Sequence, residues 1–157
     1  MKVLKQESGQ AITETAMATS LLLLLVLGIV EMGNLFFVKL TLQNAVRTAG
    51  RYAITGSCVG SGGSCSLSRY NSVLQVLQNS SAGILKPANL SEVRINCTDN
   101  GGGCPNAAGG PTDAISISIT HPFHFVSPLI SRFFPAGSYT INVSARFTNE
   151  QFLPSQS

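Results

Sequence analysis

An apolar run without a charged residue, Thr15 to Val30, limits what this chain can fold into more than any other feature. The run contains five consecutive leucines and no proline. A helix on the surface of a soluble protein keeps one face polar, and five leucines in a row leave no such face. The apolar flanks bring the segment to the length of a membrane-spanning helix. We therefore predict a membrane anchor.

A cleavable secretory signal is the competing interpretation, with Lys2 and Lys5 as its basic start. Such a signal should end in a small-residue cleavage site directly after the apolar run. The sequence that follows, EMGNLFFVKL, has no such site and continues a helical pattern. This favours an anchor that stays attached to the rest of the chain.

Two glutamates, Glu14 and Glu31, flank the uncharged run and are 17 positions apart. That separation is about 25 Å along a helix, close to the ~30 Å thickness of the hydrocarbon layer. Both carboxylates can therefore lie near opposite interfaces of a bilayer. For Glu31 we predict this interface position, or packing with Lys39 or with a cation of a neighbouring subunit.

The helical pattern continues beyond the anchor. A helix from about Gln10 to Tyr52 would be roughly 60 Å long, about twice the hydrocarbon thickness. Its second half has an apolar stripe at helical spacing, which we expect to pack against a domain outside the membrane. The stripe comprises Leu42, Ala45, Val46, Ala49 and Ala53.

The rest of the chain predicts a small α+β domain. A short amphipathic helix is expected around residues 70–77. Three later segments, 92–97, 113–123 and 138–147, alternate apolar and polar residues, which predicts an antiparallel sheet with one covered face. The predicted fold is thus α+β: a long membrane-spanning helix with a small antiparallel sheet packed on its C-terminal half.

Four cysteines, Cys58, Cys65, Cys97 and Cys104, form two stretches of the same spacing, CVGSGGSC and CTDNGGGC. Zinc sites usually have closer cysteine spacing, so we predict disulfides and an oxidising compartment, with free thiols or metal as alternatives. Three pairings are possible. We favour Cys58–Cys65 and Cys97–Cys104 because each closes a short loop. Oxidised cysteines imply that this part is exported while the N-terminus stays in the cytoplasm.

Chemistry-bearing motifs are sparse. The net charge of +3 comes from scattered residues rather than a basic stripe, which does not favour a nucleic-acid partner. His121 and His124 could form a metal-binding H-x-x-H pair, but Pro122 breaks helical spacing, so we interpret them as ordinary strand residues. The phosphate-loop, dinucleotide-binding and nucleophile-elbow motifs do not occur in the sequence. We predict no catalytic residue, metal, cofactor or small-molecule substrate.

Three N-terminal motifs, GQAITE at residues 9–14, GIVEMG at 28–33 and NAVRTAGRYA at 44–53, carry a family resemblance. Together they resemble the opening of TadE-like proteins, pilin-like components of the tight-adherence pilus system. Residues 115–150 are similar to that family's closing strands. The resemblance is strong over about the first 53 residues and moderate over the last 40. Relatives usually have an aromatic residue where this chain has Thr15.

The resemblance implies that a prepilin peptidase cleaves between Gly9 and Gln10. Glu14 would then be the fifth residue of the mature chain and would neutralise the new ammonium group of Gln10 during assembly. The implied partners are the peptidase, other pilins and inner-membrane pilus assembly proteins, besides the lipid bilayer. A domain beyond the helix indicates a minor pilin or pseudopilin rather than a major pilin.

The predicted organisation is a basic leader at 1–9, a long helix at 10–54 and an exported head at 55–157. Within the helix, residues 12–38 are the anchor and 39–54 the amphipathic extension. The predicted location is the bacterial inner membrane, with the head in the periplasm or in the filament. The leading alternative is an uncleaved single-pass protein whose exported sheet binds a partner as an assembly factor. A periplasmic enzyme is the third.

Overall fold

The computed structural model describes residues 4–58, 60–61, 64–65, 67–98, 103–105 and 107–151. They form two compact units, each described here by itself. The first contains the described residues up to Phe36 together with His124–Tyr139, and the second contains Phe37–Phe123 and the residues from Thr140 onward. The predicted boundaries at residues 9, 38 and 54 stay predictions, because this division follows packing rather than chain order.

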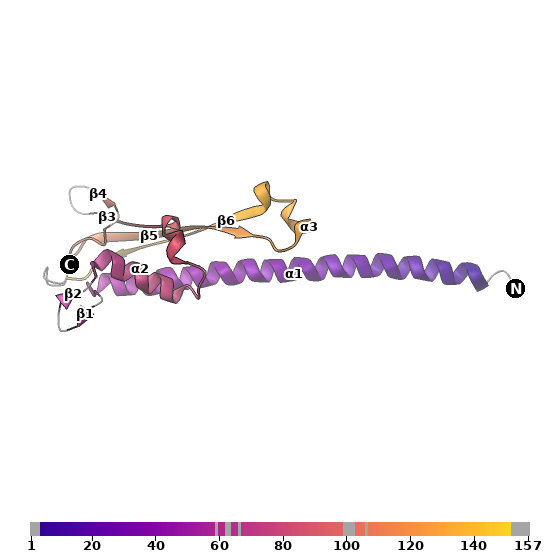
Figure 1. Ribbon diagram of the computed structural model, residues 1–157, viewed down its shortest axis with the longest axis horizontal. Coiled ribbons are helices and arrows are strands. Elements are labelled where there is room, and N and C mark those ends of the chain that lie inside the picture. Colours follow the sequence, from indigo (N-terminus) through magenta and orange to yellow (C-terminus); the bar gives the residue numbers. More distant parts are fainter. Residues whose placement is uncertain are drawn as a thin grey trace. The chain divides into compact units, whose positions relative to one another are not determined.

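The elements, in chain order, alternate between helical and extended structure (Figure 1). They are α1 (Leu4–Ile54), β1 (Gly60–Ser61), β2 (Ser64–Cys65), α2 (Arg69–Ser80), the 3₁₀ helix η1 (Pro87–Glu92), β3 (Val93–Thr98), β4 (Gly103–Pro105), β5 (Ala114–His124), α3 (Pro128–Ser131), the 3₁₀ helix η2 (Pro135–Gly137) and β6 (Ser138–Thr148).

The predicted long helix is confirmed, but it begins earlier than expected. Helix α1 starts at Leu4 rather than near Gln10, so the described leader residues are helical. The leader before Gly9 contains good helix formers, and a single glycine lowers helix stability by only about 1 kcal/mol relative to alanine. Gly9 therefore does not interrupt the helix.

The second unit is built around the apolar stripe on the C-terminal half of α1. All five predicted stripe residues are buried, whereas Asn44, Arg47 and Arg51 on the other faces are exposed. Phe147 of β6 lies against Gly50, where an added Cβ would come within 2.2 Å of its ring. The sheet thus packs directly on α1, as predicted.

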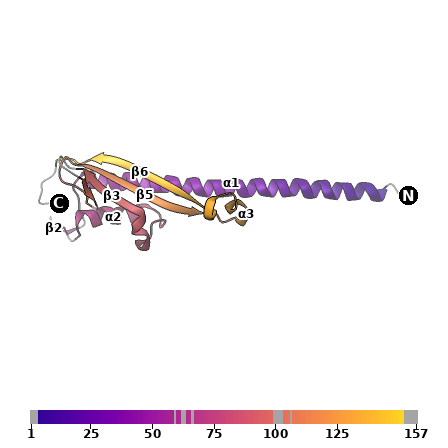
Figure 2. The same ribbon diagram turned by 90° about the horizontal axis from the view of Figure 1, so that it is seen from above.

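A four-stranded sheet with the order β4–β3–β5–β6 covers this stripe. Strand β3 is antiparallel to both β4 and β5, and Figure 2 shows β5 and β6 running in opposite directions. The expected alternation is confirmed in β3 and β5, where the inward side chains are buried and their neighbours are not. The inward residues are Val93, Ile95, Cys97, Ile115, Ile117 and Ile119.

Helix α2 contributes Val73, Leu74 and Leu77 to the same core. The Ser68 hydroxyl caps it by accepting a hydrogen bond from the Asn71 amide at 3.4 Å. At its first residue, the buried Arg69 donates hydrogen bonds to the carbonyl oxygens of Ala53, at 2.6 Å, and Gly109. Burial lowers the pKa of Arg69, while the nearby Asp113 carboxylate partly opposes this effect. Arg69 therefore joins the end of α1 to the loop before β5.

Candidate functional site

The predicted processing site lies on an open stretch of α1. Gly9, Gln10 and Glu14 are all exposed, and a Cβ added at Gly9 would meet nothing within 4 Å. Glu14 lies one helical turn after Gln10. Within the described residues, the Glu14 carboxylate has no hydrogen bond or ion pair.

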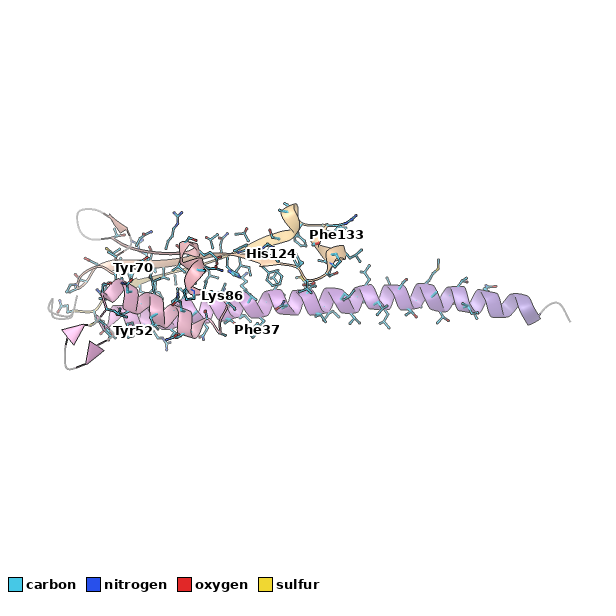
Figure 3. All side chains as sticks on the ribbon, viewed as in Figure 1. Phe37, Tyr52, Tyr70, Lys86, His124 and Phe133 are labelled. Carbon is cyan, nitrogen blue, oxygen red and sulfur yellow. The ribbon has the colours of Figure 1, made fainter. Side chains whose placement is uncertain are left out.

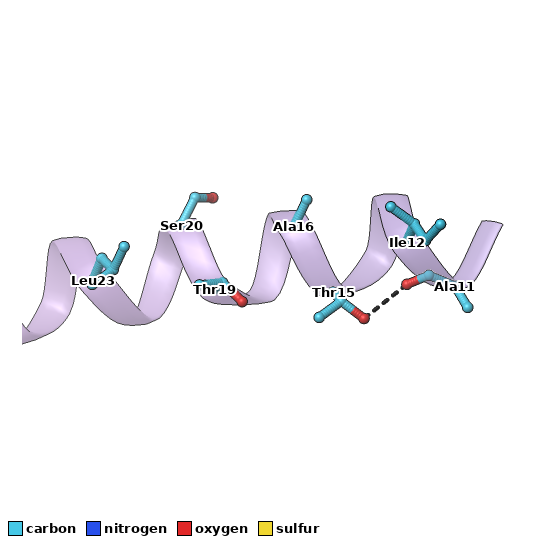
Figure 4. A pocket seen from close by; sticks show the side chains of 7 residues that line it. All are labelled: Ala11, Ile12, Thr15, Ala16, Thr19, Ser20 and Leu23. Carbon is cyan, nitrogen blue, oxygen red and sulfur yellow. Dashed lines mark hydrogen bonds between the residues drawn. The ribbon is translucent and has the colours of Figure 1, made fainter. Parts of the chain in front are cut away.

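The helix surface after this site is lined by small and hydroxyl-bearing residues (Figure 4). Thr15 donates its hydroxyl to the Ala11 carbonyl at 2.8 Å. Thr13 and Ser20 make equivalent bonds to Gln10 and Met17, also at 2.8 Å. These hydroxyl groups are satisfied by the helix itself, which is how polar side chains are tolerated in hydrocarbon. The shallow groove is lined by Ala11, Ile12, Thr15, Ala16, Thr19, Ser20 and Leu23.

The apolar run is exposed on every face of the helix. Its most apolar window has a mean hydropathy of 2.4 and is only 11% buried. Leu21 to Leu25 are each more than half exposed. A soluble protein would bury such a run, whereas lipid covers it without any packing partner. By length and composition, α1 can cross a membrane.

Glu31 has a partner that sequence reasoning missed. Its side chain is buried, and Oε1 accepts a hydrogen bond from the backbone amide of Ser127 at 2.5 Å. The second oxygen, Oε2, is buried and has no hydrogen-bond partner among the described residues. The partner found for Glu31 is thus an amide 96 positions away. The nearest sequence feature is a Ser-Pro pair, Ser127 and Pro128, shortly after the predicted strand at 113–123. Packing of Glu31 with Lys39 stays a prediction.

Ser127 belongs to a hairpin, residues 124–139, that connects β5 to β6 and contains α3 and η2. The hairpin has its own small aromatic cluster. Phe125 and Phe134 stack with ring centroids 4.3 Å apart, and Tyr139 meets Phe134 edge-on at 6.4 Å. Pro128 starts α3, where a missing amide hydrogen costs nothing. The hairpin is therefore an ordered element in contact with α1.

The two histidines lie inside a strand that continues past its predicted end. β5 runs to His124 and includes Pro122. His121 Nδ1 lies 2.7 Å from Glu92 Oε2, an ion pair when the histidine is protonated. Its partner comes from η1, far away in the sequence, so spacing alone could not reveal it. Across the described residues, no group of three potential metal ligands comes together.

Two cysteines, Cys58 and Cys97, are disulfide-bonded. The side chains of Cys65 and Cys104 lie outside the described residues, so the pairing stays a prediction. The backbone register is consistent with one predicted pair, because Cys97 on β3 stands directly opposite Cys104 on β4. Opposed residues of antiparallel strands are about 4.5–5.5 Å apart at Cα, within the range that a disulfide spans.

A second groove lies in the second unit, between α1 and β6. Lys39, Gln43 and Arg47 line it from the helix, and Asn142 and Ser144 line it from the strand. It is open and polar, and it does not bring together the groups that nucleophilic or acid–base catalysis requires.

Comparison with known proteins gives one finding. Residues 9–51 match the family model described as TadE-like protein. The match begins at Gly9 and ends within the buried stripe of α1. It therefore covers the exposed apolar run and most of the helix that supports the sheet. No curated protein and no solved structure matches the chain significantly.

Proposed function

We propose that this chain, a member of the TadE-like family by the match of residues 9–51, is a structural component of a bacterial tight-adherence pilus. Its role is that of a minor pilin or pseudopilin of a type IVb-like system. The family consists of pilus components, and the long apolar helix fits a membrane-anchored protein. The observation that carries the proposal is the family match, which begins at the glycine of the proposed cleavage site.

Maturation by a prepilin peptidase is the first step of the proposal. Gly9 and Gln10 are exposed and unobstructed, so a protease in the membrane can reach the bond between them. Cleavage would convert the backbone amide nitrogen of Gln10 into an N-terminal ammonium group. Glu14, exposed and one turn along, would then hold a charge of the opposite sign close to it.

The pairing of that ammonium with Glu14, within one chain or between neighbouring chains, would favour assembly. Two unit charges 4 Å apart attract each other by about 4 kcal/mol at an effective dielectric constant of 20, before desolvation. Removing either partner would leave an uncompensated charge in an apolar environment. Assembly should therefore depend on both cleavage and Glu14.

The proposed orientation places the N-terminus in the cytoplasm and the sheet-bearing unit outside the inner membrane. The disulfide-bonded state of Cys58 and Cys97 supports an oxidising compartment for that unit. The proposed partners are the prepilin peptidase, other pilins and the pilus assembly proteins of the inner membrane. The proposed role needs no cofactor or small-molecule substrate.

The test is to determine the mature N-terminus by mass spectrometry after expression with a prepilin peptidase. We expect wild-type protein to begin at Gln10. The Gly9→Leu variant should keep residues 1–9, whereas Gly33→Leu, the same change at another exposed helical glycine, should be processed normally. An intact N-terminus in the wild type would contradict the proposed maturation. It would favour the alternative of an uncleaved membrane protein that binds a partner through its exported sheet.

A further inference from the structure

The hairpin at residues 124–139 presents large apolar side chains on its outside. Val126 is 81% exposed, Phe133 83% and Leu129 51%. Phe133 is labelled on this hairpin in Figure 3. Arg132 beside them is also exposed. Soluble surfaces rarely leave such side chains together without a covering partner. These four residues are called the hairpin tip below.

The outward side chains are held in place by the inner face of the hairpin. Phe125 and Ser127 are buried on either side of the exposed Val126. Phe125 stacks on Phe134, and the Ser127 amide donates to Glu31. Turning Val126 inward would therefore break an aromatic contact and a hydrogen bond to a carboxylate. The tip is an organised surface.

The bond to Glu31 also gives the position of the hairpin along α1. Glu31 lies seven residues before Val38, the last residue of the predicted anchor, which is about 10 Å along the helix axis. Met32 and Phe36 after it are still about half exposed, so the apolar surface of α1 continues past Glu31. If α1 spans the membrane through this surface, residues bonded to Glu31 lie at the membrane and not beyond it.

We propose that the hairpin tip inserts into the outer interface of the same lipid bilayer that α1 spans. Val126, Leu129 and Phe133 would enter the boundary between headgroups and acyl chains, and Arg132 would remain among the lipid phosphates. This inference rests on the membrane anchoring in the proposed function. It also gives Glu31 a role. Its carboxylate accepts a hydrogen bond from the hairpin amide of Ser127 where water is scarce, and the same hydrogen bond stabilises the carboxylate.

The chain contains no tryptophan, so one introduced tryptophan reports from one place. Three single variants are reconstituted in vesicles of phosphatidylcholine and phosphatidylglycerol: Phe133→Trp in the tip, Leu24→Trp in the anchor and Thr120→Trp on an exposed position of β5. Their fluorescence is measured with lipids brominated near either end of the acyl chain, and with aqueous acrylamide.

We expect Phe133→Trp to be quenched mainly by bromine near the glycerol end, consistent with a depth of about 5–10 Å below the membrane surface. Leu24→Trp should be quenched more strongly by the deeper bromine. Thr120→Trp should respond to acrylamide only. Shallow quenching at Phe133→Trp that is absent at Thr120→Trp supports the inference.

The remaining outcomes overturn one idea at a time. If Leu24→Trp is quenched by bromine and Phe133→Trp is not, the hairpin tip does not insert, although α1 is still anchored in the membrane. If Phe133→Trp is protected from both bromine and acrylamide, protein covers the tip and the inference is wrong. Equal bromine quenching at Phe133→Trp and Thr120→Trp also contradicts a specific insertion. If Leu24→Trp itself is not quenched, the membrane anchoring of the proposed function fails.

Discussion

The two halves of α1 meet different surroundings with different side chains. Residues 21–25 are leucines that remain more than half exposed. The buried face of the second half contains mainly small residues: Ala45, Ala49, Gly50 and Ala53. Exposed leucines thus dominate the apolar run of the first half, whereas small residues dominate the face of the second half on which the sheet packs.

This difference shows how one helix can contact lipid with one half and a protein sheet with the other. Lipid adapts to any apolar surface, so the first half needs only hydrophobicity and backbone bonds that are satisfied internally. A sheet is rigid and packs as densely as a crystal, so the second half needs a matching shape. Gly50 shows this need most clearly, because the ring of Phe147 occupies the space of its missing Cβ.

The largest expected effect compares two leucines of the same helix. Leu42→Ala, at a fully buried position, should lower the free energy of unfolding of the second unit by about 2–5 kcal/mol. Leu24→Ala, at a position 55% exposed, should change it by less than about 0.5 kcal/mol. The measurement is hydrogen exchange of the β5 amides in detergent. Equal losses in the two variants would contradict the division into a lipid-facing and a packed half.

The next effect concerns the hairpin that contacts the first half. Glu31→Ala removes the acceptor of the Ser127 amide, and a hydrogen bond to a charged group contributes about 1.5–3 kcal/mol. Local opening should therefore increase roughly 10- to 100-fold. Trypsin cleavage after the exposed Arg132, followed over time in detergent, measures this opening.

Two controls define that result. Asn34→Ala, an exposed position one turn away on the same helix, should leave the cleavage rate unchanged. Glu31→Gln keeps an acceptor oxygen and should give an intermediate rate. A Glu31→Ala protein cleaved as slowly as the wild type would mean that the bond to Ser127 does not hold the hairpin.

The smallest expected effect compares two glycines. Gly50→Ala places a methyl group where the Phe147 ring lies and should destabilise the second unit by about 1–3 kcal/mol. Gly33→Ala meets nothing within 4 Å and should be neutral or stabilising, since alanine favours helix by up to about 1 kcal/mol. Thermal unfolding followed by circular dichroism compares them. Identical melting temperatures would show that the Phe147 ring moves aside at little cost and that the close packing at Gly50 is not required.

Most of the secondary structure could be predicted because its signals are local. The uncharged run, the stripe around Ala45 and Ala49 and the alternation in β3 and β5 each depend on periodicity within a few residues. Tyr139 is one of the apolar positions in the alternating segment 138–147, yet it is exposed, because it packs with the hairpin rather than with the sheet. Periodicity predicts which side chains are buried only where another element packs on that face of the strand.

The missed contacts all join residues far apart in the sequence. Glu92 pairs with His121, Glu31 with Ser127, and Gly50 lies against Phe147. In each case one residue looked ordinary until its partner was known. A hydrogen bond or a close approach depends on distance in space, which no spacing rule provides for strands and loops that return from another part of the chain.

The sequence by itself determined the long helix, its apolar anchor, the stripe that receives the sheet and the glycine–glutamate motif at its start. Those features follow from hydrophobicity and helical geometry, which act over a few residues. Only the tertiary structure decided that Glu31 is buried under a hairpin and that the hairpin turns Val126 and Phe133 outward. Those features arise from the connection between β5 and β6, which returns the chain to a helix that it left many residues before.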